Sequence, residues 1–75
     1  MKATYIFSNC QIIADRRSFS EAVREDNKLK HPYSSILNDE IGWRIAITDN
    51  ENGLILNIWL KDKDFNNYFH FFKGD

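Results

Sequence analysis

ITDNENGLILNIWL, residues 47–60, sets Asn52-Gly53 between two runs of alternating apolar residues. The Asn-Gly pair tolerates the positive φ angles of a tight turn, so this pattern is the strongest short-range indication of a β-hairpin. The stretch therefore predicts an antiparallel sheet at the centre of the fold. No catalytic or metal-binding sequence motif is attached to it.

Alternation along the two hairpin strands predicts which side chains share a face. One face is expected to hold Trp43, Ile45, Ile47, Leu54, Leu56, Ile58 and Leu60. Trp59 has the opposite parity, so we expect it on the other face beside Ile55 and Asn57. That second face is either covered by the rest of the chain or exposed as an aromatic contact surface, since exposed aromatic patches mark interfaces.

Length and composition predict a single domain over residues 1–75. The formal net charge is −1, with 10 basic and 11 acidic residues, which argues against a general electrostatic grip on nucleic acid or on an anionic membrane. Cys10 is the single cysteine, so an intrachain disulfide and a cysteine-based zinc site are excluded. The chain has no apolar run of about 18 residues and no signal-peptide pattern. We expect a soluble, cytoplasmic protein without a membrane partner.

Residues 2–14 have strand character, but the apolar parity switches near Ser8-Asn9. Such a switch fits either a β-bulge in one long strand or a tight turn between two short strands. We favour the bent long strand.

A helix is expected to follow, because Ser18-Phe19-Ser20-Glu21 is a capping box. We predict the helix over residues 19–29, with Pro32 ending any continuation. Phe19 and Val23 are expected to cover the apolar face of the hairpin, which sets the helix on a sheet rather than in a bundle.

Two segments remain less defined. Ile36, Leu37 and Ile41 are expected to anchor an ordered connection over residues 32–41, with room for one helical turn. Near the end, Phe65, Tyr68, Phe69 and Phe72 have helical spacing, whereas residues 68–72 also have strong strand propensity. We predict a last strand at 65–72 after a turn within residues 62–67. The fold class is therefore α+β: a small antiparallel sheet of about 4–5 strands with one principal helix packed on one face.

The residues that could carry out catalysis or bind a metal are few and scattered. His31 and His70 lie far apart without a metal-ligand spacing, so we expect structural or solvent-exposed roles for both. Cys10, alone on a strand, is expected to be a small buried apolar residue. Asp62 and Asp64 are explained by turn chemistry. We therefore expect no catalytic residue, no metal, no cofactor and no enzymatic activity.

The remaining candidates form a locally basic segment and one aromatic. The predicted partner-binding residues are Arg16, Arg17, Arg24, Lys28, Lys30 and Trp59. The segment is either a solvated helix face, interleaved with Glu21, Glu25 and Asp26, or a docking patch for an acidic or phosphate-rich surface.

Four short motifs carry a family resemblance. They are Met1-Lys2-Ala3-Thr4-Tyr5-Ile6, Ser18-Phe19-Ser20-Glu21-Ala22, Asn52-Gly53-Leu54-Ile55-Leu56 and Lys61-Asp62-Lys63-Asp64. In this order the chain resembles a family of small phage-encoded anti-CRISPR proteins that inhibit type I (I-F-like) surveillance complexes. The resemblance implies a small sheet with one helix that binds the Cas backbone subunits holding the guide RNA and blocks the path of target DNA.

The resemblance and the residues together predict a non-catalytic inhibitor. Its partner would be a Cas protein or a CRISPR ribonucleoprotein complex in the cytoplasm of the host cell, with nucleic acid as a further contact. The chain itself is expected to be a monomer or a small homo-oligomer. The alternative function is that of a small nucleic-acid-binding accessory protein that uses residues 16–30 against phosphates.

Overall fold

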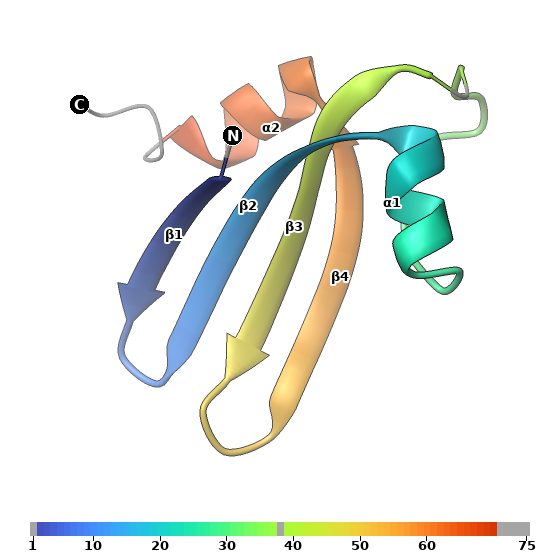
Figure 1. Ribbon diagram of the computed structural model, residues 1–75. Helices are drawn as coiled ribbons and strands as arrows, with labels where there is room; N and C mark the ends of the chain where they lie inside the picture. The colour runs from blue at the N-terminus through green and yellow to red at the C-terminus, as the bar shows by residue number, and fades with distance from the viewer. Residues whose placement is uncertain (1, 38, 71–75) are drawn as a thin grey trace.

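The computed structural model describes residues 2–37 and 39–70. Within these residues the chain forms the strands and helices β1 (Lys2–Phe7), β2 (Cys10–Ser18), α1 (Phe19–Glu25), β3 (Ile41–Asp49), β4 (Gly53–Lys61) and α2 (Asp62–Tyr68). The strands make one antiparallel sheet in the order β1-β2-β3-β4, so each strand pairs with its neighbour along the sequence (Figure 1). The predicted α+β class is confirmed.

The first two strands meet at a tight turn. Phe7 pairs with Cys10, and Ser8 between them has a φ of 50° in the left-handed region. The expectation of one bent long strand was wrong, because the parity switch marks a reversal of the chain. Asn9 also joins this turn to the second hairpin, since its carbonyl oxygen accepts a hydrogen bond of 2.9 Å from the amide of Asn50.

The predicted central hairpin is formed by β3 and β4. Asp49 pairs with Gly53, and Gly53 has a φ of 79°, a conformation that glycine adopts without steric cost. A carboxylate oxygen of Asp49 accepts hydrogen bonds from the amides of Glu51 at 2.7 Å and Asn52 at 3.2 Å. The turn is thus a loop of residues 50–52 closed by an aspartate and a glycine.

A bulge in this hairpin changes the predicted faces at one position. Ile47 pairs with Leu56, but the next residue, Thr48, pairs with Leu54, so Ile55 is an extra residue on β4. Directly paired residues share a face. Leu54 therefore lies on the face opposite to Leu56, and the expectation that both share one apolar face was wrong.

The capping box at the start of α1 is confirmed. The amide of Glu21 donates to Ser18 Oγ at 3.2 Å, and Glu21 Oε1 accepts from the amide of Ser18 at 3.1 Å. The helix ends at Glu25, four residues before the predicted end at residue 29, and Asp26 is its C-terminal cap. Asp26, which interrupts the apolar pattern, is thus the point where the chain leaves the helix.

The predicted strand at 65–72 was wrong over the described residues, because residues 62–68 form α2. Phe65 is 2% exposed and stacks on Trp43 with 4.2 Å between the ring centroids. Asp62 and Asp64 lie in the first turn of α2, where negative charge favours the helix dipole. The helical spacing of the C-terminal aromatics was the correct signal. Residues 71–72 lie outside the described residues.

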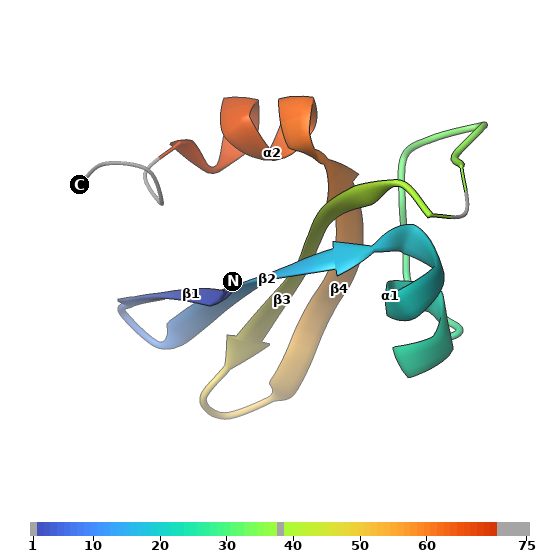
Figure 2. The ribbon, with the colours of Figure 1, turned by 45° about the horizontal axis from the view of Figure 1, so that its top comes forward.

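The helices cover opposite faces of the sheet. Trp43, under α2, pairs with Leu60, so Trp59 points to the other face, where Phe19 of α1 packs against it with 5.3 Å between ring centroids. Figure 2 shows α2 above the sheet and well apart from α1. The expectation that Phe19 covers the Ile45 and Ile47 face was therefore wrong.

The core on the α2 face is the larger cluster. It comprises Ile12, Ala14, Trp43, Ile45, Leu60 and Phe65. The connection before β3 is anchored mainly by Tyr33, whose hydroxyl donates to Asp64 at 2.6 Å. Ile36 is half-buried as expected, but Leu37 is 71% exposed and Ile41 48% exposed, so these two are not anchors. The described part of residues 32–41 contains no helical turn.

Candidate functional site: a basic groove at the β4 edge

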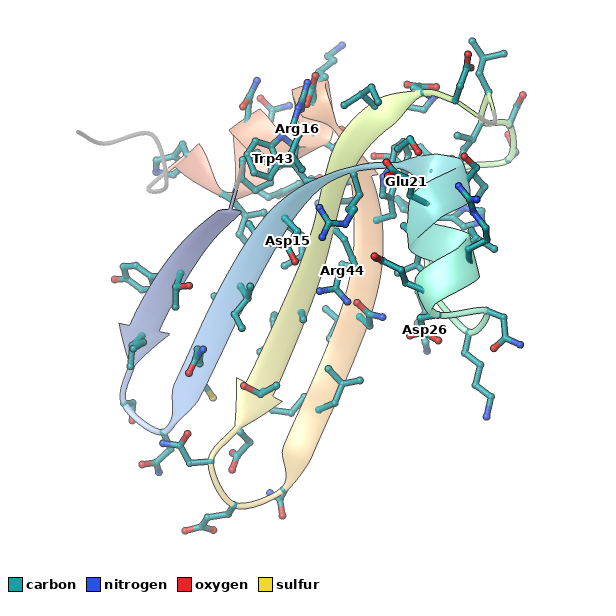
Figure 3. All side chains as sticks on the ribbon, in the orientation of Figure 1. Asp15, Arg16, Glu21, Asp26, Trp43 and Arg44 are labelled. Carbon is teal, nitrogen blue, oxygen red and sulfur yellow. The ribbon has the colours of Figure 1, made fainter. Side chains whose placement is uncertain are left out.

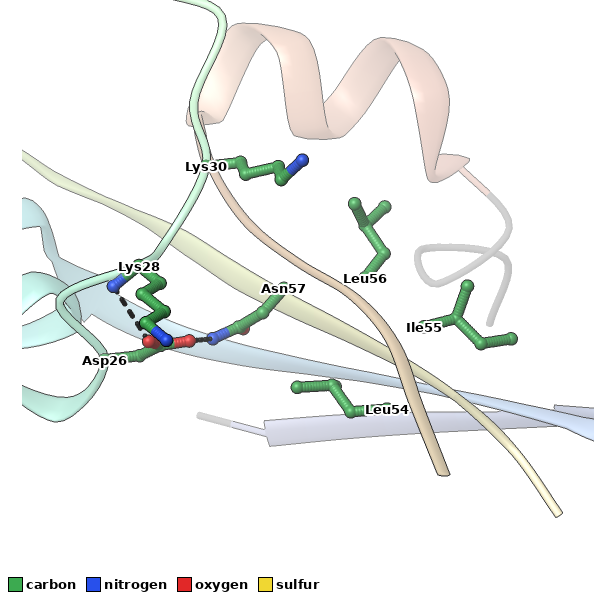
Figure 4. A pocket seen from close by; sticks show the side chains of 7 residues that line it. All are labelled: Asp26, Lys28, Lys30, Leu54, Ile55, Leu56 and Asn57. Carbon is green, nitrogen blue, oxygen red and sulfur yellow. Dashed lines mark hydrogen bonds between the residues drawn. The ribbon is translucent and has the colours of Figure 1, made fainter. Parts of the chain in front are cut away.

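A groove runs between the loop after α1 and the outer edge of β4 (Figure 4). Its volume is about 320 Å³. The residues that line it are Asp26, Lys28, Lys30, Leu54, Ile55, Leu56 and Asn57. It therefore combines two lysines from the loop with apolar side chains from the strand.

Asp26 holds the loop against β4. One of its carboxylate oxygens accepts a hydrogen bond of 2.9 Å from the amide of Lys28, and the other accepts from the side-chain amide of Asn57. The hydrogen bond from the Lys28 amide and, to a smaller extent, that from Asn57 lower the pKa of Asp26 below its usual value of 3.8. The wall of the groove is thus fixed by an ionised carboxylate whose two oxygens are already engaged.

Lys30 pairs with the edge of β4 through its backbone. Its amide donates to the carbonyl of Asn57 at 3.1 Å, and its carbonyl accepts from the amide of Trp59 at 2.9 Å. This is a parallel bridge opposite Ile58. Before residue 30 the loop diverges from the strand, and within the described residues nothing pairs with the outer side of Gly53–Leu56.

The strand side of the groove exposes large apolar side chains. Leu54 is 60% exposed and Ile55 57% exposed. The bulge at Ile55 sets Leu54 and Leu56 on opposite faces, so apolar groups flank the edge on both sides. An exposed apolar cluster beside charged groups is typical of an interaction surface.

Arg16 and Arg17, two of the predicted binding residues, are engaged within the fold. Arg16 forms a two-pronged ion pair with Asp62, in which Nη2 donates to Oδ2 at 2.9 Å, and its guanidinium lies 5.3 Å from the Trp43 ring centroid (Figure 3). Arg17 Nε lies 3.4 Å from a carboxylate oxygen of Glu25. Both arginines thus tie the end of β2 to the helices.

Trp59 is buried, so its face is covered, the first of the two alternatives, and the prediction of Trp59 as a partner-binding residue was wrong. The side chain is 0% exposed. Its indole Nε1–H donates to the carbonyl of Arg17 at 3.0 Å, so the ring reaches from β4 across β3 to β2. Phe19 and Tyr33 pack edge-on against it at 5.3 and 6.0 Å. Trp59 is therefore the centre of the core under α1.

The other three basic candidates are exposed. Lys28 and Lys30 line the groove, whereas Arg24 lies on α1 outside its lining, with Nε 3.4 Å from the carbonyl of Ser20. The structure thus brings two of the six predicted binding residues into one groove. Sequence reasoning missed its apolar half, Leu54 and Ile55, because it assigned Leu54 to the core face and did not foresee the bulge.

The residues considered for catalysis have structural contacts. His31 is exposed and packs edge-on against Phe19 at 5.2 Å. Asp62 pairs with Arg16, and Asp64 accepts from Tyr33. Cys10 is half-buried. Among the described residues, no group of three or more His, Cys, Asp or Glu side chains could hold a metal ion.

Comparisons with protein-family models, with curated proteins and with solved structures found no match for this chain. The resemblance to anti-CRISPR proteins therefore stays a prediction. Neither α1 nor α2, the helices of the described part, has the length and apolar character to cross a membrane.

Proposed function

We propose that this protein acts without catalysis, by binding a macromolecular partner through the groove at the β4 edge. The observation that supports this is the conjunction of exposed Leu54 and Ile55 with Lys28 and Lys30 around one opening. A typical stable interface takes about 800 Å² from each partner, roughly a sixth of the 5170 Å² surface of this chain. One face around the groove is large enough for that.

The partner that we propose is a type I CRISPR surveillance complex, with the chain as its inhibitor. This choice rests on the sequence resemblance alone. Inhibition by occupancy needs shape and charge complementarity and no reactive group, so it is compatible with a small domain whose polar side chains mostly hold the fold. In this proposal the bound chain would obstruct the path of target DNA.

The test combines binding with inhibition. A purified type I-F complex is immobilised, binding of the chain is measured across a salt series, and target-DNA binding by the complex is measured in parallel. We expect stoichiometric binding that removes DNA binding, with weaker affinity for the Lys28→Glu/Lys30→Glu variant. Reversal of Arg24 should add to the loss if α1 also contacts the complex. Absence of binding by the unmodified chain would refute the CRISPR partner.

The same experiment separates the nucleic-acid alternative. Labelled single-stranded RNA and double-stranded DNA are titrated with the chain alone. Since Arg16 and Arg17 are already paired with Asp62 and Glu25, we expect no shift at concentrations that saturate a protein partner. A salt-dependent shift without binding to the CRISPR complex would support the accessory-protein function instead.

A further inference from the structure

We propose that the outer edge of β4 at Gly53–Leu56 receives an acidic, extended segment of a partner protein as an added strand. This inference rests on the proposed function as a binding protein and specifies the chemistry of the bound segment. It does not depend on the partner being a CRISPR complex.

The edge of β4 already accepts one piece of extended chain. Lys30 makes two backbone hydrogen bonds to it, one to the carbonyl of Asn57 and one from the amide of Trp59. The bridge covers the edge around Ile58 and ends where the loop turns away toward Asp26. The open part of the edge, Gly53–Leu56, directly continues the covered part, so an incoming strand would extend a pairing that the fold has begun.

Apolar side chains lie on both faces of the sheet at the open edge, so an added strand could contact them from both sides. Strand addition gains affinity from main-chain hydrogen bonds and specificity from contacts to alternate side chains. Leu54 and Leu56 flank the edge on opposite faces, and Ile55 lies between them at the bulge. The four residues span about 13 Å at roughly 3.3 Å per residue, so the pairing is short and depends on these apolar contacts.

The positive charge of Lys28 and Lys30 in the groove favours an acidic segment. Figure 4 shows Lys30 projecting on the side of Leu56, while Lys28 lies beside Asp26. The groove lining holds the two ammonium groups of Lys28 and Lys30 against the single carboxylate of Asp26, so one positive charge in the lining has no matching negative charge there. A carboxylate on the incoming strand next to Lys30 would supply that compensation.

Other occupants fit less well. A nucleic-acid strand needs a basic track with stacking aromatics, whereas this groove offers two lysines and aliphatic side chains. A second copy paired along the same edge would bring the lysines of both copies to one interface, which adds like charges and not the carboxylate that would match Lys30. A peptide needs only the edge and a few side-chain contacts.

The experiment is a selection from a displayed library of random peptides of about twelve residues, long enough to span the edge at roughly 3.3 Å per residue. Selected peptides are synthesised with a fluorescent label, and their affinity is measured by anisotropy. We expect enrichment of peptides that are net acidic and rich in β-branched residues. Amide signals of residues 28–30 and 53–57 should shift on binding in NMR spectra.

Matched variants assign the binding to the groove. Lys28→Glu/Lys30→Glu should weaken the selected peptides by at least about tenfold. Lys63→Glu, a charge reversal on an exposed residue of α2, should leave their affinity unchanged. Leu54→Ser should weaken binding while the thermal midpoint of the chain stays the same, because the side chain is mostly exposed.

The inference would be overturned by enriched peptides that are basic or uncharged, by affinities unchanged in the double lysine variant, or by amide shifts confined to other elements. Displacement of the peptides by single-stranded nucleic acid, or a dimer of the chain that the groove variants abolish, would identify a different occupant. If groove variants bind a CRISPR complex normally, the inference and the role of the groove are refuted, whereas inhibition of the complex by this chain stands. If peptides bind as expected and no CRISPR complex binds the unmodified chain, the inference stands and the CRISPR partner is refuted.

Discussion

Gly42 lies at the point where the Trp59 ring crosses β3, and replacing it by alanine tests the arrangement of the core under α1. A Cβ atom added to Gly42 would lie 2.5 Å from Cζ2 of the Trp59 ring and closer still to the carbonyl oxygen of Leu60. Real Cβ atoms essentially never come within 3.0 Å of other heavy atoms. The ring cannot simply move aside, because its Nε1–H is bonded to the carbonyl of Arg17 and Phe19 packs against it.

The expected loss is large for so small a change. Overpacking a core costs about 1–3 kcal/mol, and Gly42→Ala should be at the upper end because one obstacle is backbone and the other a fixed ring. A domain of this size has a free energy of unfolding of ~5 kcal/mol. A loss of ~3 kcal/mol would lower the thermal midpoint by about 12–24 °C, at roughly 4–8 °C per kcal/mol.

Urea unfolding followed by tryptophan fluorescence, together with thermal unfolding followed by circular dichroism, measures this loss. Gly53→Ala is the matched control, because no atom lies within 4 Å of its added Cβ and its cost should be only the ~1–2 kcal/mol of a left-handed backbone. A second control is Gly42→Ala combined with Trp59→Phe, whose loss should be smaller than the sum of the single losses. A loss below about 1 kcal/mol for Gly42→Ala would refute the proposed crossing of β3 by the ring.

Three further outcomes are expected. Truncation of Ile45, which is 0% exposed, to alanine should cost about 2–5 kcal/mol in chemical denaturation. The hydrogen bond from Arg16 lowers the pKa of Asp62, so the ion pair stabilises the fold above the ordinary carboxyl pKa and is lost as the pH falls below about 4. The free energy of unfolding should therefore fall less steeply with acid in Asp62→Asn than in the unmodified chain. Burial, and to a smaller extent the hydrogen bond to Asp64, raises the pKa of Tyr33 to about 12. The stability that the neutral hydroxyl provides should therefore be lost between about pH 10 and 12. In Tyr33→Phe the free energy of unfolding should not show this decrease at alkaline pH.

Features determined by neighbouring residues were predictable from the sequence. The capping box at Ser18 and Glu21 and the hairpin closed by Gly53 depend on contacts within a few residues, and both are present. The α+β class followed from these two elements. The position of Trp59 on the face opposite Leu60 also followed, because alternation along a strand is a local property.

Features decided by distant contacts were not predictable. The sequence at 65–72 satisfies both helical and strand patterns, and the stacking of Phe65 on Trp43 decides for a helix over the described residues. The face that α1 covers depends in the same way on the contact between Phe19 and Trp59. Nothing in the local pattern indicates which face a helix will cover, so one residue pair distant in sequence reverses the expected packing.

The candidate site likewise combines features that were predictable from the sequence with features that depend on distant contacts. The lysines at 28 and 30 were identified from charge alone, but their relation to β4 depends on the bridge between Lys30 and Ile58. The partly buried ion pair of Asp15 and Arg44, 2.9 Å apart on the α1 face, had no sequence signal. Charged residues on neighbouring strands become partners only through the register of the sheet.

The position of the groove follows from how the two helices divide the sheet. Both helices are seven residues long, and they cover the end of the sheet where Trp43 and Trp59 are buried. At the other end of β4 the strand continues beyond the cover, and Leu54 and Ile55 stay exposed. An uncovered edge with apolar side chains would promote aggregation, and a bulge with flanking lysines is a known means of limiting that pairing. In the proposed binding the same features would restrict pairing to short, acidic segments, so one arrangement would serve both protection against aggregation and selective binding.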